Sequence, residues 1–216
     1  LCMKLAIYDL DDTLLCGESE IKRAKFNVKK GLIAEDLYIK KISKFEKDYR
    51  SGNLDFEAYC KFLINPLVNK HINEVKELVR EFIFEYKDQL IDKLTYELLE
   101  RHDGDKIIIA SGSLDFIVEG FSELFSVSNF LGSPIELNEG IVTGNLGGTP
   151  TFAEGKLKAV SKWCEDKSYI LEDAFFYTDS INDLPLVKAC KNSIIISPDK
   201  KLKIYAEANS LEIVNR

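Results

Sequence analysis

Two aspartates, Asp9 and Asp11, stand two residues apart directly after the first apolar run of the chain, Leu5-Ala6-Ile7-Tyr8. Like charges this close repel each other, and each carboxylate resists removal from water. A chain keeps such a pair when a cation neutralises it or when one member carries a proton. Both conditions suit phosphoryl transfer, in which one carboxylate attacks phosphorus, the other donates a proton and Mg²⁺ screens the charge.

Further polar residues follow later apolar runs. Ser111 comes directly after the β-branched segment 106–110, and Asp179 and Asp183 come after the segment 174–178. Such short apolar runs, bounded by turn residues, predict buried parallel strands. Because ligands bind at the carboxyl ends of the strands in open α/β sheets, we expect these groups to share one rim with the first aspartates.

The residues at this rim fall into an acidic group and a phosphate-binding group. On the acidic side, Asp9 can supply the nucleophile and form an aspartyl-phosphate, while Asp11 can protonate the leaving oxygen and later activate water. Magnesium prefers oxygen ligands, typically one or two carboxylates with waters and substrate oxygens. The carboxylates of Asp9 and Asp179 and the main-chain carbonyl of Asp11 are therefore the predicted ligands.

A phosphate dianion also needs donors for its remaining oxygens. Ser111 and the N–H group of Gly112, near the start of a predicted helix, can hold them. Lys156, which opens another predicted helix after Glu154-Gly155, can supply the cation.

Hydrophobic periodicity divides the chain into a helical block and an alternating part. From residue 17 to about residue 101 apolar residues recur at three- and four-residue spacing, which predicts helices. Strands then alternate with helices, which predicts a doubly wound, mostly parallel α/β sheet with the helical block inserted as a lid over the rim. The predicted strands are 4–8, 106–110, 174–178, 193–196 and 211–214, with a hairpin at 135–143 and helices at 114–125, 154–166 and from 199.

Composition excludes several classes of protein. The 216 residues are 45% hydrophobic and carry a net charge of −7, which argues against nucleic acid or an anionic membrane as partner. No run approaches the roughly 20 apolar residues of a membrane helix. The five scattered cysteines indicate reduced thiols and a cytoplasmic protein, and two distant histidines argue against a zinc site or a Ser-His-Asp triad.

Four segments, in order, resemble the motifs of the haloacid dehalogenase superfamily. Asp9-Leu10-Asp11-Asp12-Thr13-Leu14 resembles its D-x-D-x-T motif, and Ile107-Ile108-Ile109-Ala110-Ser111 its hydrophobic strand ending in Ser or Thr. Gly155-Lys156 is similar to its lysine motif, and Tyr177-Thr178-Asp179-Ser180-Ile181-Asn182-Asp183-Leu184-Pro185 to its acidic fourth motif. The match spans the chain and is closest to the phosphoserine-phosphatase-like branch.

The resemblance implies a Rossmann-like catalytic core, residues 1–16 and 92–216, with a helical cap, residues 17–91, that selects the substrate. It implies a magnesium-dependent phosphatase of small phosphorylated metabolites. The implied roles are nucleophile for Asp9, acid/base for Asp11, phosphate binding for Ser111, Gly112, Lys156 and Asn182, and the metal site for Asp9, Asp11, Asp179 and Asp183.

Two cap residues carry the expectation about the substrate. Glu18 stands where phosphoserine phosphatases hold the substrate amine, and Lys61 stands where they place an arginine for the substrate carboxylate. Lysine lacks the bidentate geometry of arginine, so histidinol phosphate and phosphocholine-like esters stand beside phosphoserine as candidates.

Two other readings of the same residues stay open. A phosphotransferase or phosphomutase would use the same aspartyl-phosphate and pass it to a second hydroxyl group. A receiver-like signalling module also carries an aspartate on a doubly wound sheet, but it is shorter and has no need of Asp11. The sequence leaves the oligomeric state open.

Overall fold

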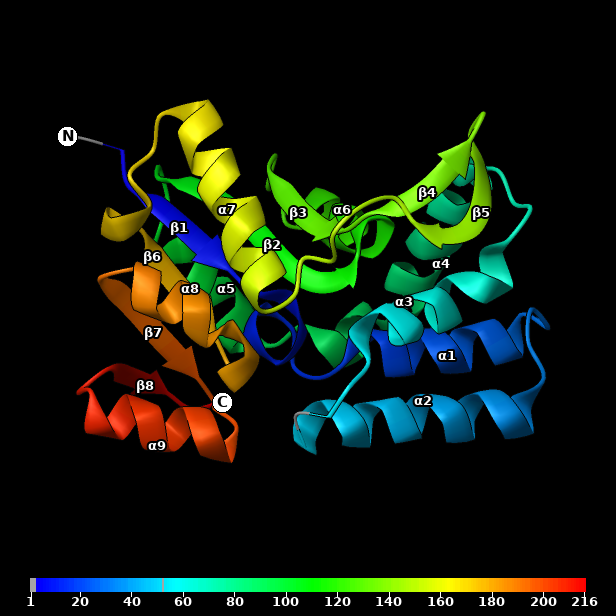
Figure 1. Cartoon of the computed structure of the whole chain (residues 1–216), viewed down its shortest axis with the longest axis horizontal. Helices are drawn as coiled ribbons and strands as arrows, with labels where there is room; N and C mark the ends of the chain where they lie inside the picture. The colour runs from blue at the N-terminus through cyan, green and yellow to red at the C-terminus, as the bar shows by residue number, and fades with distance from the viewer. Residues whose placement is uncertain (1–2, 52) are drawn as a thin grey trace.

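A parallel sheet organises the chain (Figure 1). The computed structural model describes residues 3–51 and 53–216, with the backbone alone at Leu37 and Arg50. Within this part of the chain the main sheet has six strands in the order β3-β2-β1-β6-β7-β8, each pair parallel. The strands are β1 (Leu5–Tyr8), β2 (Lys106–Leu114), β3 (Phe130–Ser133), β6 (Phe175–Thr178), β7 (Asn192–Ile196) and β8 (Glu212–Val214).

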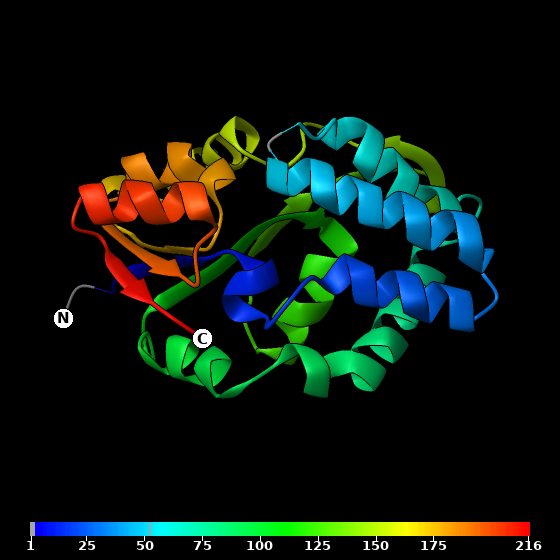
Figure 2. The same cartoon turned by 90° about the horizontal axis from the view of Figure 1, so that it is seen from below.

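Helices cover both faces of this sheet, so its central strands are apolar on both sides. Leu5 and Ile7 of β1 pack under α7 (Glu154–Lys167), α8 (Leu184–Ala189) and α9 (Lys200–Ala208). Ala6 and Tyr8 point to the opposite face, towards α5 (Lys93–Glu100) and α6 (Asp115–Leu124). The alternation along one strand thus places side chains in two hydrophobic layers. Figure 2 shows helices on opposite sides of the sheet.

Four helices between β1 and α5 lie beyond one end of the sheet (Figure 2). They are α1 (Ser19–Lys29), α2 (Glu35–Ser51), α3 (Phe56–Ile64) and α4 (Ile72–Leu90). N-terminal side-chain hydrogen bonds fix where two helices begin. At α3 the Asp55 carboxylate accepts from the N–H of Ala58, and at α5 Asp92 and Thr95 form a reciprocal capping box. We call α1–α4 the cap helices.

A two-stranded hairpin of the core also reaches the cap helices. It comprises β4 (Ile135–Asn138) and β5 (Ile141–Leu146), and β5 packs against α3. Backbone hydrogen bonds join the two parts, from Ile72 N–H to the Gly140 carbonyl at 2.8 Å and from Val142 N–H to the Lys70 carbonyl at 2.9 Å. The hairpin therefore anchors the loop before α4 to the core.

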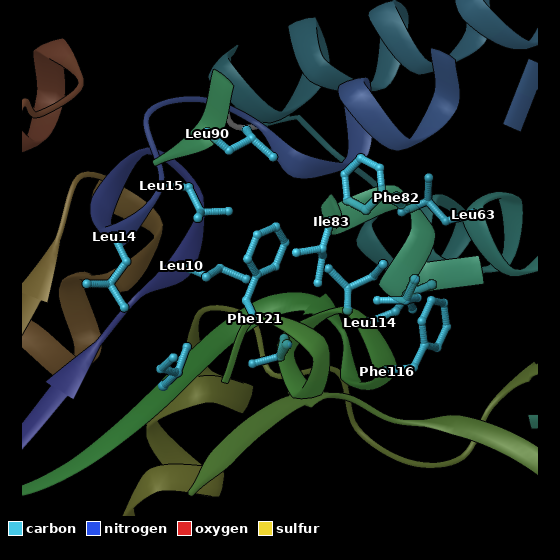
Figure 3. Close-up of a cluster of buried hydrophobic side chains, with 14 of the residues drawn as sticks. Leu10, Leu14, Leu15, Leu63, Phe82, Ile83, Leu90, Leu114, Phe116 and Phe121 are labelled. Atoms are coloured by element: carbon cyan, nitrogen blue, oxygen red, sulfur yellow. The ribbon is translucent and has the colours of Figure 1, made fainter. Parts of the chain in front are cut away.

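One hydrophobic cluster crosses from the cap helices into the core (Figure 3). Phe82 and Ile83 of α4 meet Phe121 of α6, and Leu10 after β1 lies in the same cluster. A Cβ atom on Gly120 of α6 would lie 2.6 Å from a methyl carbon of Val79. Only glycine allows this approach of the two helices.

The structure confirms the predicted α/β class with a mostly parallel sheet and flanking helices. The hairpin and the strands near 4–8, 106–110, 174–178, 193–196 and 211–214 are present, whereas the edge strand β3 was not predicted. The division into a core (residues 1–16 and 92–216) and a cap (residues 17–91) remains a prediction. Residues 1, 2 and 52, which include Cys2, lie outside the described part of the chain.

Two further expectations concern the cysteines and membrane-spanning helices. Among the described cysteines, Cys16, Cys60, Cys164 and Cys190 are free thiols. Within residues 3–51 and 53–216, no helix combines the length and apolar character needed to cross a membrane.

Candidate active site

Asp9 precedes the turn that follows β1, and Asp11 lies inside this turn. The chain turns in η1 (Leu10–Leu14), where Asp12 adopts a positive φ of 53°, a conformation that aspartate tolerates better than most residues. Asp9 is 6% exposed. The Asp11 carboxylate accepts hydrogen bonds from the Ser19 N–H at 2.6 Å and from the Ser113 hydroxyl at 2.7 Å. These two donors fix the orientation of Asp11 on the side of the cap helices.

Lys156 joins two of the predicted carboxylates. Its buried ammonium lies 3.0 Å from Oδ1 of Asp9 and 2.7 Å from Oδ2 of Asp183. The Thr178 hydroxyl donates to the same Asp183 oxygen at 2.7 Å. Gly155 makes this placement possible, because a Cβ atom there would lie 2.1 Å from the Pro150 carbonyl oxygen. The predicted lysine is thus held by carboxylates from two strand ends.

Burial and mutual repulsion raise the pKa values of the acidic residues here. Burial raises the pKa of Asp11 to about 6, although the hydrogen bonds from Ser113 and Ser19 oppose it. Burial also raises the pKa of Asp9, against the opposing charge of Lys156. The pKa of Asp179 is raised well above its ordinary value by burial and then by the charge of Asp9. One ammonium does not balance this group of carboxylates.

This donor set fits a magnesium ion. Asp9 and Asp179 are carboxylates whose charged forms need a further cation, and magnesium binds one or two carboxylates and completes its shell with waters and substrate oxygens. Among the described residues, no cluster of three or more Asp, Glu, His or Cys side chains forms a complete metal-binding site. Asp183, which was also predicted to belong to the metal site, forms its side-chain contacts with Lys156 and Thr178.

The phosphate-side residues lie under the cap helices. Ser111 is 2% exposed and lines the same cavity as Asp9, Lys156 and Gly112. A Cβ atom on Gly112 would lie 3.1 Å from the ring of Phe56. Glycine therefore lets a cap ring rest against the strand end where phosphate is expected.

Aromatic contacts close the cap helices over this rim. Phe56 of α3 stacks on Phe152 of the loop before α7, with ring centroids 4.0 Å apart and planes 2° from parallel. The Tyr49 hydroxyl of α2 donates to the Ser180 hydroxyl oxygen at 3.1 Å. Both contacts join a cap helix to a core loop, so the cap helices lie over the cavity that the predicted site residues line.

The cavity has the predicted catalytic residues on its core side and residues of the cap on its other side. Three cap carboxylates line it, Glu18, Glu20 and Glu46. Lys156 is the one cationic side chain among the described residues that line it. The aromatic residues of the wall are Phe45, Tyr49, Phe56, Tyr59 and Phe152.

The structure brings together most of the predicted site residues. Asp9, Asp11, Ser111, Gly112, Lys156, Asp179, Asp183 and Glu18 line one cavity. Asn182 lies outside that lining, and its side-chain amide donates to the Ser180 hydroxyl oxygen at 3.1 Å. The expected phosphate contact of Asn182 stays a prediction.

The structure does not place Lys61 at the cavity, so its expected contact with a substrate carboxylate stays a prediction. Its ammonium pairs with Glu57, one turn earlier on the exposed face of α3, at 2.9 Å, and it does not line the cavity. The helical face that carries Lys61 points away from the site, because Cys60, Leu63 and Ile64 are the buried residues of α3.

Two functional candidates were not predicted from the sequence. Glu20, in the first turn of α1, is 3% exposed, and Phe152 supplies the core half of the aromatic stack. The spacing of Glu20 and Arg23, three residues apart on one helix face, was the available signal for a charge pair. Nothing in the sequence indicated that this pair is buried.

Comparisons with known proteins agree with this geometry. A model of the haloacid dehalogenase-like hydrolase family matches residues 6–188. The chain therefore belongs to the haloacid dehalogenase-like hydrolases. It is similar to a histidinol-phosphatase of Neisseria meningitidis, with 33% identity over 217 residues that cover 98% of each chain.

Solved structures give the same fold. A Bordetella pertussis Tohama I protein described as of unknown function superposes with a TM-score of 0.89 at 25% identity, covering 99% of each chain. A substrate-bound phosphoserine phosphatase superposes with a TM-score of 0.69 at 19% identity, covering 99% of this chain and 93% of the other. The chain is a phosphoric monoester hydrolase by family and by its phosphatase-named relatives.

Proposed function

We propose that this hydrolase cleaves a small phosphate monoester through an aspartyl-phosphate on Asp9. The observation that carries the proposal is the buried Lys156 ammonium, which lies 3.0 Å from Asp9 inside a covered cavity. There the ammonium stabilises the carboxylate form that a nucleophile requires and faces the space where a phosphate would lie.

The steps follow from the positions of the side chains. Asp9 attacks phosphorus while the bond to the ester oxygen breaks, and Asp11 transfers its proton to the departing alcohol. Asp11, then a carboxylate, takes a proton from water as the water oxygen attacks phosphorus. The bond to Asp9 breaks, and inorganic phosphate leaves. In this proposal the hydrogen bonds from Ser113 and Ser19 orient Asp11 for proton transfer to the leaving alcohol.

Magnesium is part of this proposal. When bound by Asp9, Asp179 and the Asp11 carbonyl, the ion would neutralise the phosphate charge and lower the barrier to attack by an anion. The contacts of Phe56 with Phe152 and of Tyr49 with Ser180 hold the cap helices over the cavity, and removal of water from such a site strengthens the electrostatic interactions inside it.

Histidinol phosphate is the substrate that we propose. The Neisseria relative, similar over 98% of both chains, is named as a histidinol-phosphatase. Among the described residues, the cavity offers no second cation for a substrate carboxylate, because Lys156 is engaged by Asp9 and Asp183. This arrangement disfavours phosphoserine, which carries a carboxylate.

The test is phosphate release from a panel of esters with Mg²⁺, using the wild-type protein and Asp9→Asn. The panel contains histidinol phosphate, phosphoserine, phosphocholine and p-nitrophenyl phosphate. We expect the highest kcat/KM for histidinol phosphate and no turnover of any ester by Asp9→Asn, since an amide is a poor nucleophile. Wild-type-like release by Asp9→Asn would end the mechanism, and transfer to an added alcohol in place of water would favour the phosphotransferase alternative.

A further inference from the structure

We infer that Glu20 is a specificity-determining residue that binds a protonated nitrogen in the alcohol part of the substrate. The inference rests on the proposed phosphatase function and adds to it a recognition site for an ammonium or imidazolium group. Its starting point is a buried acceptor atom without a partner, on a residue that lines the cavity.

Glu20 has one carboxylate oxygen with a partner and one without. Oε2 forms an ion pair with Nε of Arg23 at 2.7 Å, and both side chains are 4% exposed. Oε1 is buried and has no hydrogen-bond partner among the described residues. A buried acceptor without a partner is costly, and this one belongs to a residue that lines the cavity.

Arg23 holds the carboxylate in place. Its guanidinium also donates to the Leu63 carbonyl at 3.3 Å and lies 5.7 Å from the centre of the Phe116 ring. These contacts tie Glu20 to α3 and α6, so the open oxygen has a fixed position before any ligand arrives. Little ordering is then needed when a donor binds.

The surroundings of Glu20 favour a cation as that donor. Glu18 and Glu46 add carboxylates to the same lining. Burial and the neighbouring charges of Asp11, Asp12 and Asp179 raise the pKa of Glu18, in agreement with an excess of negative charge at this side of the cavity. The aromatic wall, which includes Tyr59, offers ring faces that attract cations.

The chemistry defines a class of substrate. It is a phosphate monoester whose alcohol part carries a protonated amine or imidazole and no carboxylate. A carboxylate in that part would meet Glu18, Glu20 and Glu46 and, among the described lining residues, no free ammonium.

A pair of probes isolates the nitrogen. Phosphoethanolamine and ethyl phosphate differ by one ammonium group, so the ratio of their kcat/KM values measures recognition of that group. We expect the wild-type ratio to favour phosphoethanolamine and Glu20→Gln to lower the ratio about 10- to 100-fold, the range of one hydrogen bond to a charged group.

The control variant is Glu57→Gln, the same change at an exposed cap residue outside the cavity, which should keep the wild-type ratio. The glutamine of Glu20→Gln can still accept a hydrogen bond from Arg23. If this variant does not fold, the double variant Glu20→Gln/Arg23→Gln, which removes both buried charges, is measured in the same way. A ratio within twofold of the wild-type value in the folded variant would show that Oε1 holds only water, and it would overturn the inference while leaving the phosphatase intact. Absence of phosphate release from every ester, p-nitrophenyl phosphate included, would overturn the proposed function itself.

Discussion

Replacing Lys156 with methionine tests the centre of the site. Methionine keeps the length of the side chain but removes the ammonium that bridges Asp9 and Asp183. Both carboxylates are buried, at 6% and 2% exposure, so neither can turn to solvent for compensation. The variant therefore leaves two buried acids without their shared partner.

The magnitude follows from this geometry. Removing one partner of a buried ion pair costs about 3–5 kcal/mol of stability, which for a chain of this size lowers Tm by about 6–20 °C. Lys156 opposes the rise in the pKa of Asp9, so its loss raises that pKa further and leaves the nucleophile protonated near neutral pH. We expect kcat to fall about 10²–10³-fold, the range that mutagenesis gives for a lost electrostatic donor.

The assay combines thermal unfolding with phosphate release from p-nitrophenyl phosphate. A folded carboxyl group with a raised pKa binds more protons than its unfolded form, so the stability of the variant relative to wild type should recover as the pH falls from 8 to 5. Adding Asp183→Asn removes one buried charge and should restore much of the stability but none of the activity. Lys158→Met, at an exposed position of the same helix, is the control. A Tm loss no larger than that of the control, or near-wild-type turnover, would refute the reasoning.

Three further predictions concern Asp11 and the metal. Asp11→Asn should lower kcat about 10²–10⁴-fold for alkyl phosphates and less for p-nitrophenyl phosphate; an equal loss for both esters would make Asp11 a structural residue. Because burial raises the pKa of Asp11 to about 6, kcat/KM for an alkyl phosphate should fall as the pH rises through that value, and a pH profile of Asp11→Asn that keeps this slope would contradict the assignment. Exhaustive chelation should abolish phosphate release and Mg²⁺ should restore it, whereas Ca²⁺ should support binding with little turnover; full activity in the metal-free protein would exclude the proposed metal role.

The parts that the sequence predicted share one property. Asp9, Ser111 and Asp179 each follow an apolar run long enough to be a central strand, and parallel strands bring their carboxyl ends together without further information. The hairpin at 135–146 was also predictable, because Asn138-Glu139-Gly140 is a turn between apolar segments.

The parts that it did not predict depend on tertiary packing. The strand β3 (Phe130–Ser133) is four residues long, contains Gly132 and lies at the sheet edge, so its sequence resembles a loop. Lys61 and Glu20 are both charged residues of amphipathic helices, and periodicity alone does not say that one faces solvent while the other is buried with Arg23. Only the docking of α1 against α3 and α6 decides between them.

The cluster that joins Phe82 and Ile83 to Phe121 has a consequence for how specificity in such a chain can change (Figure 3). The cap helices share their hydrophobic interior with the core and are also bonded to the β4–β5 hairpin, so they cannot be exchanged as an independent module. A chimera that carries another protein's cap would bring a mismatched surface to α6 and leave cavities or clashes there. New substrates are therefore more accessible through single replacements inside the cavity, at positions such as Glu20 and Tyr59, than through recombination of whole domains.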